Sequence, residues 1–71
     1  MKSVATSRFW RAFAELSPKE QRRAQKQYGL WRRDSNHPSL HFKKVGVWWS
    51  ARVDDDCRAV GYLKDDTIYW V

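Results

Sequence analysis

Two arginines on either side of an acidic run are the residues of this sequence best suited to chemistry. Arg52 precedes Asp54–Asp56 and Arg58 follows it, a spacing that makes the arginines neighbours across a tight β-hairpin. Like charges that face each other destabilise a sheet, so such a pair is either solvated or serves to bind an anion. Arginine suits the second role because its planar guanidinium binds a phosphate through two parallel hydrogen bonds.

Three more polar side chains are predicted to share the face of these arginines. If the strands alternate at period two and the loops are short, His41 lies opposite Arg52, and Lys43 lies opposite Ser50. The strands bring no carboxylate to this face, whereas an ordinary solvated sheet face mixes charges of both signs. The pattern therefore predicts a phosphate-binding surface.

Structural explanations compete with these assignments. Arg58 can pair with Asp54 or Asp56 in the adjoining turn, and the two lysines of the first strand can protect a sheet edge from aggregation. His41 can be an ordinary sheet histidine. Cys57 is interpreted as a small buried apolar residue and not as a nucleophile.

The elements that position these residues follow from the periodicity of the chain. Three apolar residues at helical spacing predict a helix over 7–16, with Ser7 as its N-cap. A capping box at Ser17–Glu20, with proline at the first helical position, predicts a second helix that runs to about Arg33. The segment Asp34–Pro38 then stops the helix, because a residue before proline disfavours helical backbone.

After Pro38 the chain alternates between apolar and polar residues at period two, which predicts a run of strands. The loops between them are so short that they demand antiparallel hairpins, the first a type II′ turn with Gly46 at its first central position. The expected fold is α+β, with an N-terminal two-helix hairpin packed on a four-stranded antiparallel meander in a single domain over residues 1–71. The four predicted strands are Leu40–Val45, Trp48–Val53, Cys57–Leu63 and Thr67–Val71.

The register of these hairpins assigns one face of the sheet to the core. The expected pairs are Val45 with Trp48, Val53 with Cys57, and Lys64 with Thr67. All four strands then agree on one apolar face, broken only by Lys44, and this face is expected to receive the two helices. The opposite face carries Trp48, Tyr62 and Tyr69 beside the polar cluster, and Trp48 can stack on a base or cover a partner. The residues expected in the core face are Leu40, Phe42, Trp49, Ala51, Val53, Cys57, Ala59, Gly61, Leu63, Ile68 and Trp70.

Positive charge is concentrated in the first part of the chain. The net charge is +6, with eleven Lys and Arg against three acids in residues 1–44 and three against five in residues 45–71. The second predicted helix has one apolar stripe and one basic stripe, and Arg22, Arg23 and Lys26 of the basic stripe are candidates for contact with nucleic acid. The same stripe can be an ordinary solvated face or can dock an acidic protein.

Composition excludes several other classes of protein and site. Cys57 is the only cysteine, which rules out an intramolecular disulfide or a zinc site built from cysteines and suits the reducing cytoplasm. The sequence has no signal peptide and no apolar run near the roughly 18 residues that a membrane span needs. No metal, cofactor or membrane partner is therefore predicted, and the pattern does not specify an oligomeric state.

Four short motifs, in this order and at hairpin spacing, resemble the RelE/ParE superfamily of toxins from bacterial toxin–antitoxin modules. They are His-Pro-Ser-Leu at 37–40, Phe-Lys-Lys-Val at 42–45, Trp-Ser-Ala-Arg-Val at 49–53 and Arg-Ala-Val at 58–60. The two preceding helices fit the same order. The resemblance implies a small α+β fold with a curved sheet packed on an N-terminal helical hairpin.

The resemblance also implies partners and roles. Many members are metal-independent endoribonucleases that cut messenger RNA in the ribosome, others poison DNA gyrase, and a cognate antitoxin wraps the toxin with an acidic or amphipathic segment. By position, Lys43, Lys44 and Arg52 inherit the binding and polarisation of the scissile phosphate. Arg58 matches a recurrent arginine after the third turn, where its role is partly structural.

The chemistry of the predicted face is compatible with RNA cleavage. Attack of a ribose 2′-oxygen on the adjacent phosphate needs a base, cations for the developing charge, and an acid for the leaving oxygen. Arg52 with Lys43 can stabilise that charge, and His41 can move a proton.

Two departures from the family pattern bear on this activity. Cys57 stands where members usually have an aromatic residue, commonly tyrosine. Members also generally continue past the strand matching Thr67–Val71 through glycine, histidine and a tyrosine segment that often completes the acid–base set.

The resemblance and the chemistry of the predicted face together give the expected function: the toxin of a type II module that cuts messenger RNA. The alternatives are an RNA- or antitoxin-binding member without catalysis and a gyrase poison.

Overall fold

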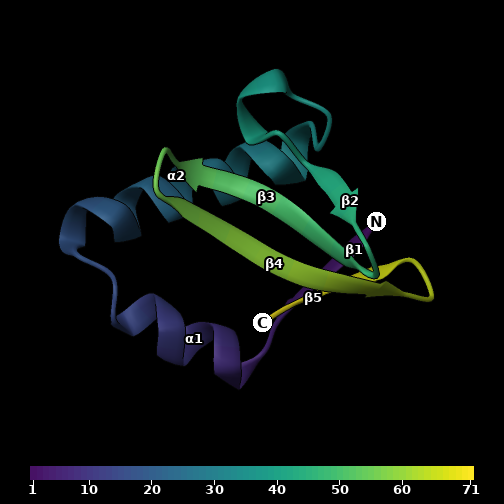
Figure 1. Ribbon diagram of the computed structural model, residues 1–71, viewed down its shortest axis with the longest axis horizontal. Helices are drawn as coiled ribbons and strands as arrows, with labels where there is room; N and C mark the ends of the chain where they lie inside the picture. Colours follow the sequence, from purple (N-terminus) through teal and green to yellow (C-terminus); the bar gives the residue numbers. More distant parts are fainter.

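Two helices and a five-stranded sheet make up the computed structural model, which describes residues 1–71 (Figure 1). Strands β3 and β4 form the long central hairpin, α2 lies behind them in this view, and α1 lies below and to the side. The elements in chain order are β1 (Lys2–Ala5), α1 (Ser7–Ala14), α2 (Pro18–Arg33), the 3₁₀ helix η1 (Pro38–Leu40), β2 (Lys43–Val45), β3 (Trp48–Asp54), β4 (Cys57–Lys64) and β5 (Thr67–Trp70). The α+β class predicted from the sequence is confirmed.

The sheet is mixed and has one strand more than the sequence predicted. Its order is β1-β5-β4-β3-β2, in which β2 to β5 form the expected antiparallel meander and β1 pairs with β5 in parallel. The prediction of a four-stranded antiparallel sheet was therefore wrong at this edge. Two hydrogen bonds to the carbonyl of Trp70 fix the end of β1, one from the backbone N–H of Thr6 at 3.1 Å and one from its hydroxyl at 2.7 Å.

The turns fix the register of the meander. Gly46 has φ +64°, as the first central position of a type II′ turn requires, and Val45 pairs with Trp48 as predicted. Asp65 and Asp66 both have positive φ, which is the type I′ conformation that aspartate tolerates well. Between β3 and β4 the predicted pairing was wrong by one position next to the acidic turn.

An irregularity in β3 shifts the pairing next to the acidic turn. Arg52 pairs with Arg58, but the next pair is Asp54 with Cys57, so Val53 is the extra residue where a pairing of Val53 with Cys57 was expected. A bulge of this kind bends the strand and re-aims side chains close to it. It shortens the connecting loop to two residues and brings the acidic turn close to Arg52.

The strand predicted over Leu40–Val45 is shorter than expected. Pro38 begins η1, the ring Nδ1 of His37 accepts a hydrogen bond from the N–H of Ser39 at 3.2 Å, and only the last three residues of the range belong to β2. His41 follows η1 in the left-handed region, with φ 44°. It therefore lies outside the strand ladder that was expected to carry it.

Both helices begin with side-chain caps. The capping box of α2 is confirmed, with Ser17 and Glu20 bonded reciprocally, and the helix ends at Arg33 as predicted. The cap of α1 is Thr6 and not Ser7, and this helix ends at Ala14, two residues before the predicted end. Thr6 thus both ends β1 and begins α1.

The core lies between α2 and the face of the sheet turned toward the helices, here called the inner face. Its buried residues are Trp31, Leu40, Ala51, Ile68 and Trp70. Leu40, Ala51, Ile68 and Trp70 were predicted to lie in the core face, and the structure confirms them there. The ring of Trp31 meets that of Trp70 edge to face, with their centroids 5.5 Å apart. Leu63, expected on the same face, is exposed because no helix covers that end of β4.

A matched pair of glycine substitutions tests the packing of the sheet. A Cβ at Gly61 would lie 2.9 Å from the backbone oxygen of Tyr69 and 3.0 Å from a side-chain carbon of Ile68. We expect Gly61→Ala to lower the free energy of unfolding by about 1–3 kcal/mol because the β4–β5 contact must open. Gly29→Ala, which meets nothing within 4 Å in α2, should raise it by up to about 1 kcal/mol. Urea unfolding followed by tryptophan fluorescence measures both, and equal effects would contradict this packing.

Candidate functional site

The two arginines that flank the acidic run face each other on the sheet. Arg52 of β3 pairs directly with Arg58 of β4, on the face turned away from the helices, here called the outer face. Arg58 is exposed and has no carboxylate within salt-bridge distance, so the pairing with Asp54 or Asp56 considered above does not occur. Nothing in the strand ladder compensates the repulsion between the two guanidinium groups.

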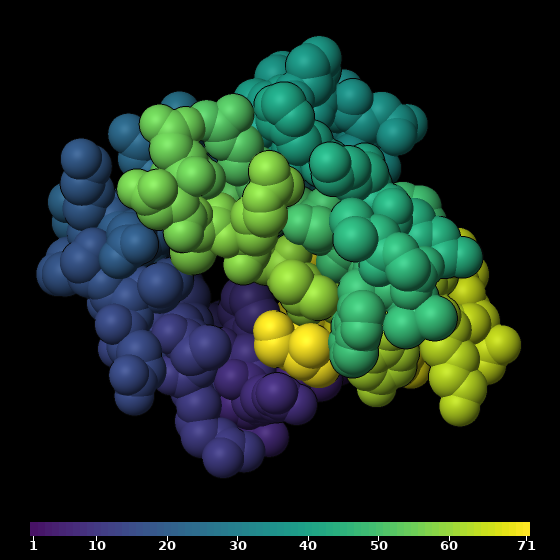
Figure 2. Space-filling model, viewed as in Figure 1, coloured from purple at the N-terminus to yellow at the C-terminus, as the bar shows by residue number.

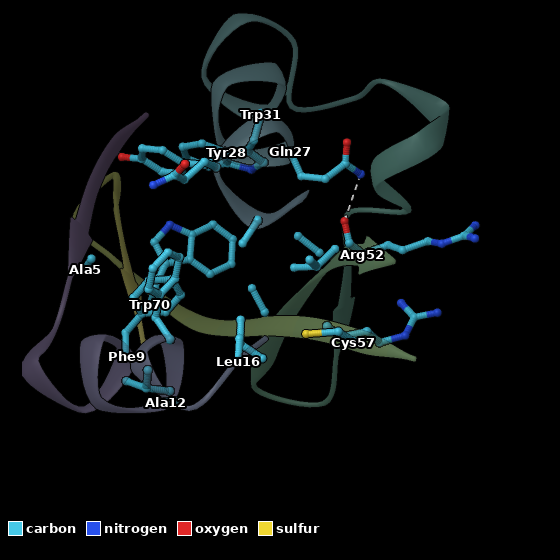
Figure 3. A pocket seen from close by; sticks show the side chains of 18 of the residues that line it. Ala5, Phe9, Ala12, Leu16, Gln27, Tyr28, Trp31, Arg52, Cys57 and Trp70 are labelled. Carbon is cyan, nitrogen blue, oxygen red and sulfur yellow. Dashed lines mark hydrogen bonds between the residues drawn. The ribbon is translucent and has the colours of Figure 1, made fainter. Parts of the chain in front are cut away.

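Arg52 is held by three neighbours. Its Nη2 forms a salt bridge with Asp55 of the acidic turn, and its Nη1 lies 3.5 Å from Nε2 of His41. The side-chain amide of Gln27 in α2 donates a hydrogen bond to the backbone oxygen of Arg52 at 3.0 Å (Figure 3). The backbone of Arg52 is thus held by α2, and Figure 3 shows its side chain extending away from the labelled residues of α1 and α2.

The salt bridge to Asp55 brings a carboxylate to a face that the strands alone leave without one. The carboxylate comes from the turn, and its side chain is 84% exposed. Exposed ion pairs contribute only about 0.2–1 kcal/mol, so a phosphate can displace Asp55 from Arg52. Asp55 therefore occupies the place that an anionic ligand would take.

The remaining strand residues of the predicted site are divided between the two faces. Lys43 pairs with Ser50 on the outer face as predicted, and its side chain is exposed. Ser50 is only 9% exposed, so its hydroxyl is largely covered by its neighbours. Lys44 pairs with Trp49, whose side chain belongs to the inner face, so the structure does not bring Lys44 to the cluster around Arg52.

A polar groove continues from Arg52 to the basic stripe of α2. It has a volume of about 700 Å³, and its charged and polar lining residues are Arg23, Lys26, Gln27, His37, Ser39, Arg52 and the acid Asp54. Arg22 is exposed but does not line this groove. Of the helix residues predicted to contact nucleic acid, two are thus contiguous with the cluster on the sheet.

A second groove, which is apolar, lies between α1, α2 and the inner face. Its volume is about 360 Å³, and 16 of its 20 lining residues are hydrophobic. Figure 2 shows the molecule hollowed between its N-terminal third, in purple and blue, and the sheet, in green and yellow. The aromatic rings of Phe9, Trp10 and Phe13 pack on one another along α1. Arg52 and Arg58 are the only charged residues among those that line this groove.

Cys57 lies at the end of the apolar groove (Figure 3). Its burial raises the pKa of the thiol, and the negative charges of Asp54 and Glu20 raise it further. A raised pKa keeps the thiol protonated, which disfavours a role as nucleophile. The interpretation of Cys57 as a small apolar residue agrees with this environment.

Two residues of the site were missed by sequence reasoning. Gln27 gives no signal, because a glutamine within a predicted helix does not show which backbone it will meet. Asp55 stood in a run of three aspartates, and only the bulge at Val53 decides which of them reaches Arg52. The sequence therefore predicted the pairing of Arg52 with Arg58 but not the carboxylate that forms the salt bridge with Arg52.

In comparisons with known proteins, no protein-family model, no curated protein and no solved structure matches this chain. The likeness to RelE/ParE toxins therefore rests on the sequence motifs alone. None of the helices is sufficiently long and apolar to cross a membrane. No three side chains of the His, Cys, Asp or Glu type lie together as a metal site would require.

Neutralising the partner of Arg52 should strengthen anion binding. In Asp55→Asn the guanidinium loses its competing carboxylate, so we expect the affinity for a short labelled RNA to rise about two- to fivefold, the range of an exposed ion pair. Asp56→Asn makes the same change in net charge at a residue with no ion pair and should have a smaller effect. Fluorescence anisotropy at fixed ionic strength measures both, and equal gains in affinity would contradict competition at Arg52.

The raised pKa of Cys57 has a consequence for reactivity and for stability. The thiol of Cys57 binds its proton more tightly in the folded protein than in the unfolded chain, and this difference stabilises the fold. The stabilisation is present below the ordinary thiol pKa of about 8.5 and is lost as the pH rises through the pKa of Cys57 in the folded protein. Alkylation of Cys57 by iodoacetamide should accordingly be slower at pH 8 to 9 than in the urea-unfolded chain. Asp54→Asn, which keeps the oxygen that accepts the N–H of Asp56 at 2.9 Å, should accelerate it. Equal rates in folded and unfolded protein would contradict this.

Proposed function

We propose that this protein binds RNA through its outer face and acts as the toxin of a type II toxin–antitoxin module, cutting messenger RNA in the ribosome. The observation that carries the proposal is the direct pairing of Arg52 with Arg58 on adjacent strands. A sheet gains nothing from this repulsion, whereas a phosphate between two guanidinium groups is bound by both.

The surroundings of the pair support an extended polyanion over a small one. Lys43 lies on the same face, and Arg23 and Lys26 continue the positive surface along the polar groove. A net charge of +6 on 71 residues attracts a nucleic-acid backbone over distances beyond direct contact. Several phosphates of one strand can therefore be bound in sequence.

The chemistry proposed for this face is transesterification of the RNA backbone. The ribose 2′-oxygen forms a bond to phosphorus while the bond to the 5′-oxygen of the next nucleotide breaks, leaving a 2′,3′-cyclic phosphate and a 5′-hydroxyl. Arg52, assisted by Lys43, stabilises the charge on the phosphate oxygens. His41, with Nε2 3.5 Å from the Arg52 guanidinium, takes the proton of the 2′-hydroxyl or gives one to the leaving oxygen.

One observation favours the non-catalytic alternative. The reaction moves two protons, one off the nucleophile and one onto the leaving group, but His41 is the only imidazole beside Arg52. His37 lines the polar groove from η1 and its ring is already bonded to Ser39. Phosphate binding is therefore better supported than cleavage, and the assay below separates the two.

The apolar groove supports the antitoxin as a partner. An amphipathic helix with one acidic edge fits this groove. The apolar side of the helix would meet the aromatic residues of α1, and its acids would meet Arg52 and Arg58, which also line the groove. Such a helix would neutralise the cations that bind phosphate. The product of an adjacent antitoxin gene should protect Cys57, which lines the groove, from alkylation, and an unprotected thiol would contradict this docking.

A cell-free translation assay tests the proposal. The purified protein should inhibit translation, and mapping of RNA 5′ ends should show cuts within ribosome-bound messages. Arg52→Gln should reduce cutting by at least about tenfold, since it removes one charged contact to the reacting phosphate. Arg8→Gln removes the same side chain from the exposed surface of α1 and should cut normally.

Three outcomes have distinct meanings. RNA binding without any cuts would favour the non-catalytic alternative, with binding that weakens as salt rises. Normal cutting by Arg52→Gln would remove the proposed site. Translation unaffected but gyrase supercoiling inhibited in a parallel assay would support the gyrase alternative.

A further inference from the structure

A row of three aromatic side chains crosses the outer face beside the arginine pair. Tyr62 of β4 pairs with Tyr69 of β5, and their rings are stacked with centroids 5.1 Å apart. On the other side of Tyr62, the ring of Trp48 in β3 meets it edge to face at 6.2 Å. The three rings thus form one continuous row across three adjacent strands, here called the aromatic row.

The aromatic row is not part of the core. Trp48 is 43% exposed and Tyr62 is 39% exposed, and both are on the face that no helix covers. Aromatic residues on a solvated sheet face contribute to cross-strand pairing, but a smaller alternating Thr or Val serves that purpose with less exposed apolar surface. The exposed ring faces are therefore available to a ligand that presents flat apolar surfaces of its own.

The row and the cation pair belong to the same face and the same two strands. Trp48 and Arg52 are four residues apart on β3, and Tyr62 and Arg58 are four residues apart on β4. At roughly 3.3 Å per residue, the backbone positions of the aromatic residues and the arginines are about 13 Å apart along the strands. One short polymer with alternating anionic and flat aromatic parts can reach both, and a nucleic-acid strand is such a polymer.

We propose that the aromatic row stacks unpaired nucleobases of the strand whose phosphates bind Arg52 and Arg58, which makes single-stranded RNA the ligand of this face. The inference rests on the proposed function for the phosphate contacts and adds the contribution of the bases. In a duplex the faces of the bases are stacked on one another and cannot reach a protein ring, whereas an unpaired base can. Stacking tolerates any sequence because every base has a π-face.

Three ligands of equal length separate the bases from the backbone. They are a single-stranded RNA, the same RNA annealed to its complement, and an abasic ribose-phosphate oligomer. We expect the intact protein to bind the single strand at least about fivefold more tightly than the abasic oligomer, as stacking of one or two bases would give. The duplex should bind no better than the abasic oligomer.

Substitutions in the row identify the rings as the cause. Tyr62→Leu should abolish the difference between single strand and abasic oligomer and leave abasic binding unchanged, while Tyr62→Phe, which keeps the ring, should retain it. Val47→Ala removes an apolar side chain without a ring that is 76% exposed in the turn before Trp48, and it should behave as the intact protein. Circular dichroism melting confirms that each variant is folded.

The outcomes distinguish this inference from the proposal on which it rests. Equal binding of the single strand and the abasic oligomer, or tighter binding of the duplex, overturns base stacking while phosphate binding stands. A base-dependent gain that survives in Tyr62→Leu also overturns it. Absence of binding to all three ligands at low salt overturns both.

Discussion

The register between β3 and β4 is the constraint on which the rest of this structure depends. A shift of one residue would exchange the two faces of the sheet, since side chains alternate along a strand. In the observed register Ala51 and Trp49 join the core, and Arg52 meets Arg58 on the outer face. The same choice that buries the apolar residues therefore forces the two arginines together. Core formation offsets the repulsion, so the close approach of the two arginines is a by-product of packing as much as of local charge.

The features that the sequence predicted correctly are local, and the features that it missed depend on contacts that no local pattern shows. Period-two alternation and turn residues act locally, and they gave the helical capping box at Ser17, the meander and the Arg52–Arg58 pair correctly. β1 could not be found in this way, because Ser3 pairs with Ile68 far along the chain and a four-residue segment carries no periodicity of its own. His41 was misplaced in a strand because Pro38, two residues before the predicted start of that strand, begins a 3₁₀ helix that runs to Leu40.

The sequence predicted that Arg52 and Arg58 face each other, but it also grouped Lys44 and Arg22 with them, which the structure does not. Residue type and spacing identify which side chains share a face, but not which partner a flexible guanidinium selects. That choice depends on the bulge at Val53, which brings Asp55 rather than Asp54 or Asp56 to Arg52. The hydrogen bond from the amide of Gln27 could not be predicted either. It joins α2 to the backbone oxygen of Arg52, and no pattern in either segment indicates that the two residues meet. Helix-to-sheet contacts of this kind are fixed only when the whole core is packed.

The parallel pairing of β1 with β5 has a consequence for the order in which the molecule folds. The β2–β5 meander and α2 are built from contacts between neighbouring segments and can form early, because closing a short loop loses little entropy. β1 can pair only after β5 has formed, and its register, which joins Lys2 to Thr67 and Ala5 to Trp70, closes the longest loop in the sheet. Thr6, which caps α1, donates two hydrogen bonds to Trp70 of β5, so the position of α1 depends on this long-range contact. The apolar groove between α1 and the sheet depends on it too, whereas the Arg52–Arg58 pair needs only the local β3–β4 hairpin.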